Sequence, residues 1–139
     1  MDEAVEALTR GNVAEVKVLL ASVAIALAFY QLVVIAVGYG RLRVPFLAAP
    51  PAFAAHRAVG DTIALLLLCT GVMCVSVYGF EDDERLHEIS GTALLGVLAL
   101  KISVVRRDFG LGRFLPLLGL SVFALLCLTW VTSAGGFLR

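Results

Sequence analysis

Four long apolar stretches constrain the fold of this chain more than any other feature. They cover roughly residues 16–37, 54–78, 86–105 and 114–137. An α-helix needs about 20 mainly apolar residues to cross a hydrocarbon core of ~30 Å, and each stretch meets that requirement. Hydrophobic residues make up 60% of the 139-residue chain, above the roughly 45–50% of soluble domains. We therefore predict an all-α integral membrane protein, with residues 1–139 forming a single transmembrane domain.

The connections between the four stretches are short, which favours an up-down-up-down four-helix bundle. The second connection is the shortest and predicts a tight antiparallel hairpin of the second and third spans. The first connection, 38–53, contains Pro45, Pro50 and Pro51 and is expected to lie along the interface, because proline at this density breaks helices. Pro116 falls in the first turn of the fourth span, where its missing amide donor is harmless.

Basic residues are concentrated on one side of the predicted membrane. The side that holds the first and third connections carries Arg41, Arg43, Arg57, Lys101, Arg106, Arg107 and Arg113. The opposite side holds both termini and the acidic loop 81–85, with fewer basic residues. The excess of arginine and lysine predicts that loops 38–53 and 106–113 are cytoplasmic. Both termini would then face outward.

The only two histidines, His56 and His87, occupy matching contexts. Each is followed four residues later by a glycine, Gly60 or Gly91, and then by a mostly apolar stretch. A glycine at i+4 lies beside the histidine on one helix face, so it leaves room for a flat ligand such as a haem. Ionisable residues at membrane depth often mark functional sites. The alternative is that each histidine is an ordinary interfacial residue.

The histidines open two similar helix faces, which we call the interior stripes. In the second span the stripe contains His56, Gly60, Ile63, Leu67, Thr70 and Cys74, and in the third His87, Gly91, Leu94, Leu98 and Lys101. Their likeness predicts that both helices line a common interior. Because the helices are antiparallel, the histidines should lie roughly 30 Å apart at 1.5 Å per residue. They cannot bind the same iron.

Polar residues elsewhere in the spans allow more than one interpretation. Asp61 follows Arg57 at the i,i+4 spacing of an ion pair; this carboxylate could belong to a proton path or to a neutralised structural bridge. The three cysteines, Cys69, Cys74 and Cys127, match no zinc or thioredoxin spacing. We interpret them as small buried hydrophobic residues.

The hairpin from His56 to Arg107 resembles the small di-haem b-type cytochromes of bacterial membranes, which are related in design to ferric-reductase-like transmembrane domains. In that family two adjacent helices each carry two histidines about fourteen residues apart. This sequence matches at His56 with Gly60 and at His87 with Gly91, and departs at Thr70 and Lys101, where the second histidines would stand. The succinate dehydrogenase membrane anchor has a similar His-Arg-x-x-Gly element. The resemblance implies a bacterial plasma (inner) membrane, haem b and a quinone.

Because the second histidines of the family are absent, the two ends offer different possible haem ligands. Met73 could complete the coordination of a haem on His87, because His/Met ligation is established haem chemistry and the two residues differ in depth by about 5 Å. His56 would need Lys101, about 9 Å away in depth, or a residue of another subunit. We therefore expect one haem or none.

The basic residues around His56 have a second interpretation. Arg57, Lys101, Arg106 and Arg107 cluster where haem propionates, a lipid headgroup or a quinone carbonyl could bind. Lysine and arginine near span ends also snorkel to the headgroups without any ligand. Lys101 lies deeper than the arginines, and for it both interpretations stay open.

Two functions follow. The first is a b-type cytochrome-like electron-transfer subunit, working between quinone and an outer partner, with loop 81–85 docking a soluble electron carrier. The alternative is a non-catalytic accessory or anchor subunit without haem, embedded in the bilayer beside other membrane subunits or in a homo-oligomer. Neither is a stand-alone enzyme. Soluble-enzyme motifs are absent, no broken-helix pair indicates a transporter, and nothing indicates nucleic-acid binding.

Overall fold

The fold is a bundle of four long helices, seen in a computed structural model that describes residues 12–45, 49–79, 85–107 and 110–137, together with residues 3, 7 and 10. The helices are α2 (Val13–Gly38), α3 (Ala49–Tyr78), α4 (Arg85–Arg107) and α5 (Leu115–Phe137), with a 3₁₀ turn, η2 (Gly112–Phe114), before α5. All four helices are long and apolar enough to cross a membrane. The predicted all-α, four-span fold is confirmed.

Helix ends follow local chemistry. Helix α2 ends in a Schellman motif, in which Arg41 N–H bonds the Ala36 carbonyl oxygen (2.8 Å) and Gly40 N–H that of Val37 (2.9 Å). Gly40 has a φ of 68°, a left-handed conformation that glycine adopts without strain. Helix α3 begins at Ala49, five residues before the predicted start at residue 54. The reason is that Pro50 and Pro51 occupy its first turn, where their missing N–H groups have no intrahelical partner to lose.

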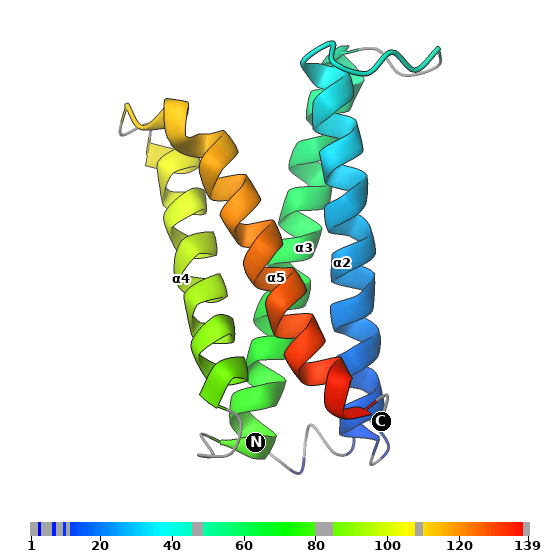
Figure 1. The fold of residues 1–139 in the computed structure, drawn as a ribbon, viewed down its shortest axis with the longest axis vertical. Helices are drawn as coiled ribbons and strands as arrows, with labels where there is room; N and C mark the ends of the chain where they lie inside the picture. The colour runs from blue at the N-terminus through cyan, green and yellow to red at the C-terminus, as the bar shows by residue number, and fades with distance from the viewer. Residues whose placement is uncertain are drawn as a thin grey trace.

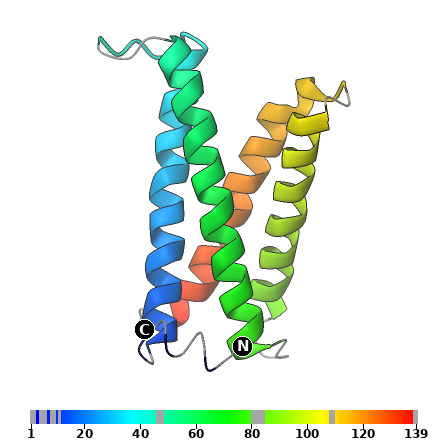
Figure 2. The ribbon, with the colours of Figure 1, turned by 180° about the vertical axis from the view of Figure 1, so that it is seen from behind.

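The helices pair as two hairpins. Helix α2 packs along α3, and α4 packs along α5, whereas α3 and α4 meet over a short length only. Figures 1 and 2 show the two hairpins close together at the end that holds the termini and diverging toward the other end. We call these the His87 end and the His56 end. The predicted tight pairing of the second and third spans is therefore wrong, because α3 and α4 diverge toward the His56 end and meet over a short length only.

All four helices contribute to one core. Its buried residues are Ala24 and Ala28 of α2, Ile63 and Leu67 of α3, Leu94 of α4, and Val122 and Leu126 of α5. Small residues such as Ala24 and Ala28 let helices approach closely in a membrane bundle. Ile63, Leu67 and Leu94 belong to the predicted interior stripes, so the prediction that both stripes face a common interior is confirmed.

Two further contacts join the hairpins. The rings of Phe29 on α2 and Phe123 on α5 meet edge to face, with centroids 4.9 Å apart. The indole N–H of Trp130 on α5 donates to Ser22 Oγ on α2 over 3.0 Å, and Ser22 in turn donates to the carbonyl oxygen of Val18 over 2.7 Å. Both contacts hold α5 against α2, and the Trp130–Ser22 contact adjoins the cavity, which Trp130 lines.

Candidate ligand-binding site

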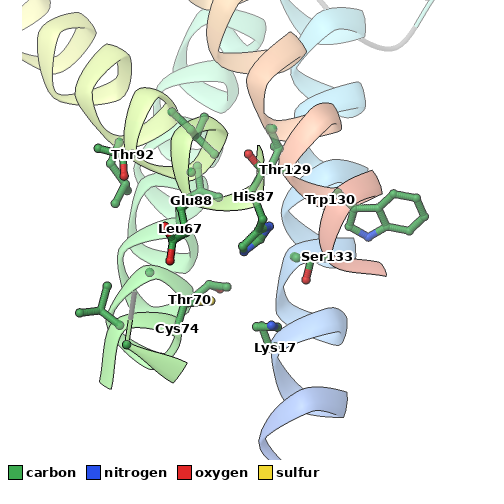
Figure 3. Close-up of a pocket in the computed structure, with 18 residues that line it drawn as sticks. Lys17, Leu67, Thr70, Cys74, His87, Glu88, Thr92, Thr129, Trp130 and Ser133 are labelled. Atoms are coloured by element: carbon green, nitrogen blue, oxygen red, sulfur yellow. The ribbon is translucent and has the colours of Figure 1, made fainter. Parts of the chain in front are cut away.

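A cavity of about 330 Å³ lies inside the bundle at the His87 end. This volume is at the lower end of the roughly 300–1,000 Å³ typical of small-molecule sites. Every helix contributes to its lining, which is mainly apolar. Leu67, Leu94 and Leu126 contribute to the lining and are themselves almost fully buried in the core. The polar residues of the lining are labelled in Figure 3: Lys17, Thr70, Cys74, His87, Glu88, Thr92, Thr129, Trp130 and Ser133.

His87 is the central polar group of the cavity. It is the third residue of α4, and its ring projects into the space between α3 and α5 (Figure 3). Its Nδ1 lies 3.2 Å from Thr132 Oγ1. The Thr132 hydroxyl is also 3.0 Å from the carbonyl oxygens of Leu128 and Thr129, so its single proton is donated to its own helix. Thr132 Oγ1 then accepts from the ring.

This arrangement favours one tautomer of His87. With the proton on Nδ1, the neutral ring carries its lone pair on Nε2. A ring nitrogen of this kind accepts a hydrogen bond from a ligand hydroxyl or binds a metal. Thr132 is not among the described residues that line the cavity. Thr132 therefore orients the His87 ring without itself contacting the cavity.

Ser133 supplies a second polar group. Its half-buried side chain lines the cavity, and within the described residues its hydroxyl has no protein hydrogen-bond partner. The neighbouring Thr129 hydroxyl, in contrast, donates to the carbonyl oxygen of Leu125 over 2.8 Å. Ser133 can therefore donate to a ligand oxygen, whereas His87 Nε2 can accept from a ligand hydroxyl.

Gly91 lies one turn from His87 and keeps part of the cavity open. A methyl group built at this position would come no closer than 3.9 Å to another side chain, the methyl carbon of Thr129. An alanine fits there in ordinary contact, but a long side chain would fill the cavity. The pairing of His87 with an open glycine face is thus present at this end.

The matching motif at the other end has different surroundings. Gln31 of α2 donates through Nε2 to the carbonyl oxygen of His56 over 2.8 Å, and the same Nε2 would lie 3.0 Å from a Cβ at Gly60. Gly60 therefore makes room for a side chain of the protein, where the sequence predicted room for a flat ligand. His56 Nδ1 is enclosed and has no hydrogen-bond partner in the described chain.

The remaining predicted residues at the His56 end do not line the cavity. Arg57 is exposed on α3, and Lys101 extends toward Gly119 of α5. None of these residues, nor His56 or Gly60, is among those that line the cavity. The structure thus brings His87 and Gly91 together in a cavity and leaves the His56 group outside it.

The two haem ligands predicted for the His87 end are not both placed on the cavity. Met73 is half-buried but is not among the described residues that line the cavity around His87. In the described part of the chain, no group of three or more His, Cys, Asp and Glu side chains could hold a metal ion. The Met73–His87 ligand pair remains a prediction that this geometry does not favour.

Sequence reasoning missed the contribution of α5. Thr129, Trp130, Thr132 and Ser133 form a polar group in an otherwise apolar span, and that grouping was the available signal. The signal is weak because serine and threonine in membrane helices commonly bond their own backbone. Only the fold shows that Thr132 contacts His87. It also shows that the Ser133 hydroxyl makes no hydrogen bond to its own helix within the described residues.

The comparison with family models identifies the chain over nearly its whole length. Residues 2–139 match DUF6529, a family of unknown function, and the chain belongs to that family. Neither curated proteins nor solved structures give a match.

Proposed function

We propose that this chain is a membrane subunit that binds a quinol or quinone in the cavity around His87. The observation that carries the proposal is the orientation of His87: its Nδ1 is engaged by Thr132 at 3.2 Å, and the ring lines an apolar cavity of about 330 Å³. A quinol hydroxyl could donate to Nε2, and a quinone oxygen could accept from Ser133. The apolar lining suits the ring between them.

The position of the cavity also suits a lipid-soluble ligand. On α3, α4 and α5 the polar groups of the lining lie nearer to the His87 end than the leucines do, so a ring with oxygen substituents could contact the leucines while its oxygens reach the polar groups. If the basic loops are cytoplasmic, as their arginine content predicts, the His87 end faces outward from a bacterial plasma membrane. The acidic loop, with its proposed electron carrier, lies outside the described residues, apart from Arg85.

Trp130 provides a direct test, because it is the only tryptophan in the chain and lines the cavity. Quinones quench indole fluorescence at short range. We expect a short-tailed benzoquinone or naphthoquinone to quench Trp130 saturably in lipid nanodiscs. His87→Ala should weaken binding about tenfold, the equivalent of a ligand hydrogen bond of about 1.4 kcal/mol, and Gly91→Leu should abolish saturation by filling the cavity.

His56→Ala is the matched control, because it removes a histidine with the same sequence context outside the cavity. Its titration should be the same as that of the unmodified chain. Quenching that rises linearly without saturation, equally in all variants, would show only partition of the quinone into lipid and would overturn the proposal. A haem assay on the same preparations separates this function from a cytochrome: stoichiometric haem that depends on His87 would contradict quinone binding there.

A further inference from the structure

Asp61 is an exposed carboxylate near the middle of a membrane span. It lies on α3, about 4 Å from the midpoint of the span Pro50–Val77 at 1.5 Å per residue. An ionisable side chain at this depth is costly unless it is paired or faces a polar interior. Asp61 points away from the interior stripe of α3 and makes no hydrogen bond or ion pair within the described residues. A partner on another molecule would offset the cost of this charge.

The nearest cation in the sequence does not neutralise it. Arg57 lies one turn away on α3 and is also exposed, yet the two side chains form no ion pair in the described structure. Lys101 has a similar depth on α4, but its ammonium group approaches Gly119 of α5. An acid and a base thus stand one turn apart on the outer side of α3, each available to another molecule.

The surrounding surface has the spacing of a helix-packing seam. Ala54, Ala58, Asp61, Leu65, Leu68 and Val72 are all exposed and alternate at intervals of four and three residues. We call this set the outer stripe. That spacing is the 3.5-residue repeat by which parallel helices interlock, and the two alanines allow close approach. Figure 2 shows α3 in front of the other helices, with none of them lying over it.

From this juxtaposition we infer that the outer stripe is a homodimer interface, in which a second copy of this chain packs α3 against α3. With a twofold axis along the membrane normal, residues at the same depth in the two copies face each other. Arg57 occupies the position that flanks the seam, where interhelical ion pairs form in coiled coils. Each Arg57 then reaches the Asp61 of the second copy, one turn away. A surface that carries both charges is complementary to itself, as a twofold interface requires.

This interface is separate from the proposed quinone site, because no residue of the outer stripe is among the described residues that line the cavity. Disulfide crosslinking in native membranes tests it, on a full chain whose three cysteines are replaced by alanine. Leu65→Cys and Leu68→Cys should give covalent dimers on mild oxidation. Leu120→Cys on α5 is the matched control, since Leu120 and Leu65 are similarly exposed at 58% and 62%, and it should give at least about fivefold less dimer.

Charge exchange tests the ion pairs themselves. In the Leu65→Cys background, Asp61→Arg or Arg57→Asp alone should lower the dimer yield about tenfold, because each places like charges across the seam. The double exchange Arg57→Asp with Asp61→Arg should restore it, which a folding defect would not do. Equal crosslinking at Leu65 and Leu120, failure of the double exchange to restore the yield, or adducts with a protein of another mass would overturn the homodimer.

Discussion

At the scale of the residue, one hydroxyl group decides what His87 can do. Thr132 gives its proton to its own helix and accepts from the imidazole, which leaves Nε2 as the acceptor toward the cavity. Hydrogen bonding of one ring nitrogen commonly sets the chemistry of the other. Thr132 is thus a positioning residue that acts through His87 without lining the cavity.

We expect Thr132→Val to raise the quinone Kd about three- to tenfold, since one hydrogen bond contributes about 0.5–1.5 kcal/mol. The substitution keeps the shape of the side chain and leaves the cavity lining unchanged. The measurement is the saturable quenching of Trp130 in nanodiscs. Thr62→Val is the control, because Thr62 is exposed on α3 and donates only to Ala58 of its own helix; its Kd should not change. An unaltered Kd in Thr132→Val would show that the ring needs no such orientation.

At the scale of the element, glycines in helix interiors have different roles. Gly60 of α3 adjoins Gln31, whose amide bonds the His56 carbonyl and so ties α2 to α3. Gly96 of α4 has no other side chain within 4 Å of a Cβ built there. The first glycine makes room for an interhelical contact, whereas the second only weakens its helix.

Alanine at these two positions should therefore have unequal effects on stability. Gly96→Ala should stabilise the chain by about 0.5–1 kcal/mol, the usual gain in helix propensity. Gly60→Ala should be less stable than Gly96→Ala by about 1 kcal/mol, because the methyl group displaces the Gln31 amide from its hydrogen bond. The measurement is reversible unfolding in mixed micelles. In a Gln31→Ala background, Gly60→Ala and Gly96→Ala should have the same free energy of unfolding. A difference that persists there would contradict the assigned contact.

The helices themselves were largely predictable from sequence, and their partners were not. Apolar length alone predicts four spans, and the periodicity that groups Ile63 and Leu67 with His56 predicts which faces turn inward. The start of α3 was misplaced because Pro50 and Pro51 were interpreted as helix breakers, although a first turn tolerates both. Pairing depends on contacts between distant residues, such as Phe29 with Phe123, which short connections do not specify.

At the scale of the whole molecule, the two ends of the bundle differ although their histidine motifs match. The hairpins meet at the His87 end, where Trp130 bonds Ser22 and the cavity forms, and they diverge at the His56 end (Figure 1). The sequence predicted that a haem would bind more readily at the His87 end, because His56 lacks a good second ligand. The structure gives another reason, namely that Gln31 fills the space beside Gly60 whereas the space beside Gly91 stays open.

The central claim is that a quinone binds inside the bundle at the His87 end, and photolabelling measures this most directly. An azido-quinone would be irradiated with the chain in nanodiscs, and the labelled peptides would be identified by mass spectrometry. We predict labels within residues 85–95 and 126–133, suppressed by excess unlabelled quinone and lost in Gly91→Leu. Labels concentrated around His56, or spread over the lipid-facing surfaces without competition, would contradict the account.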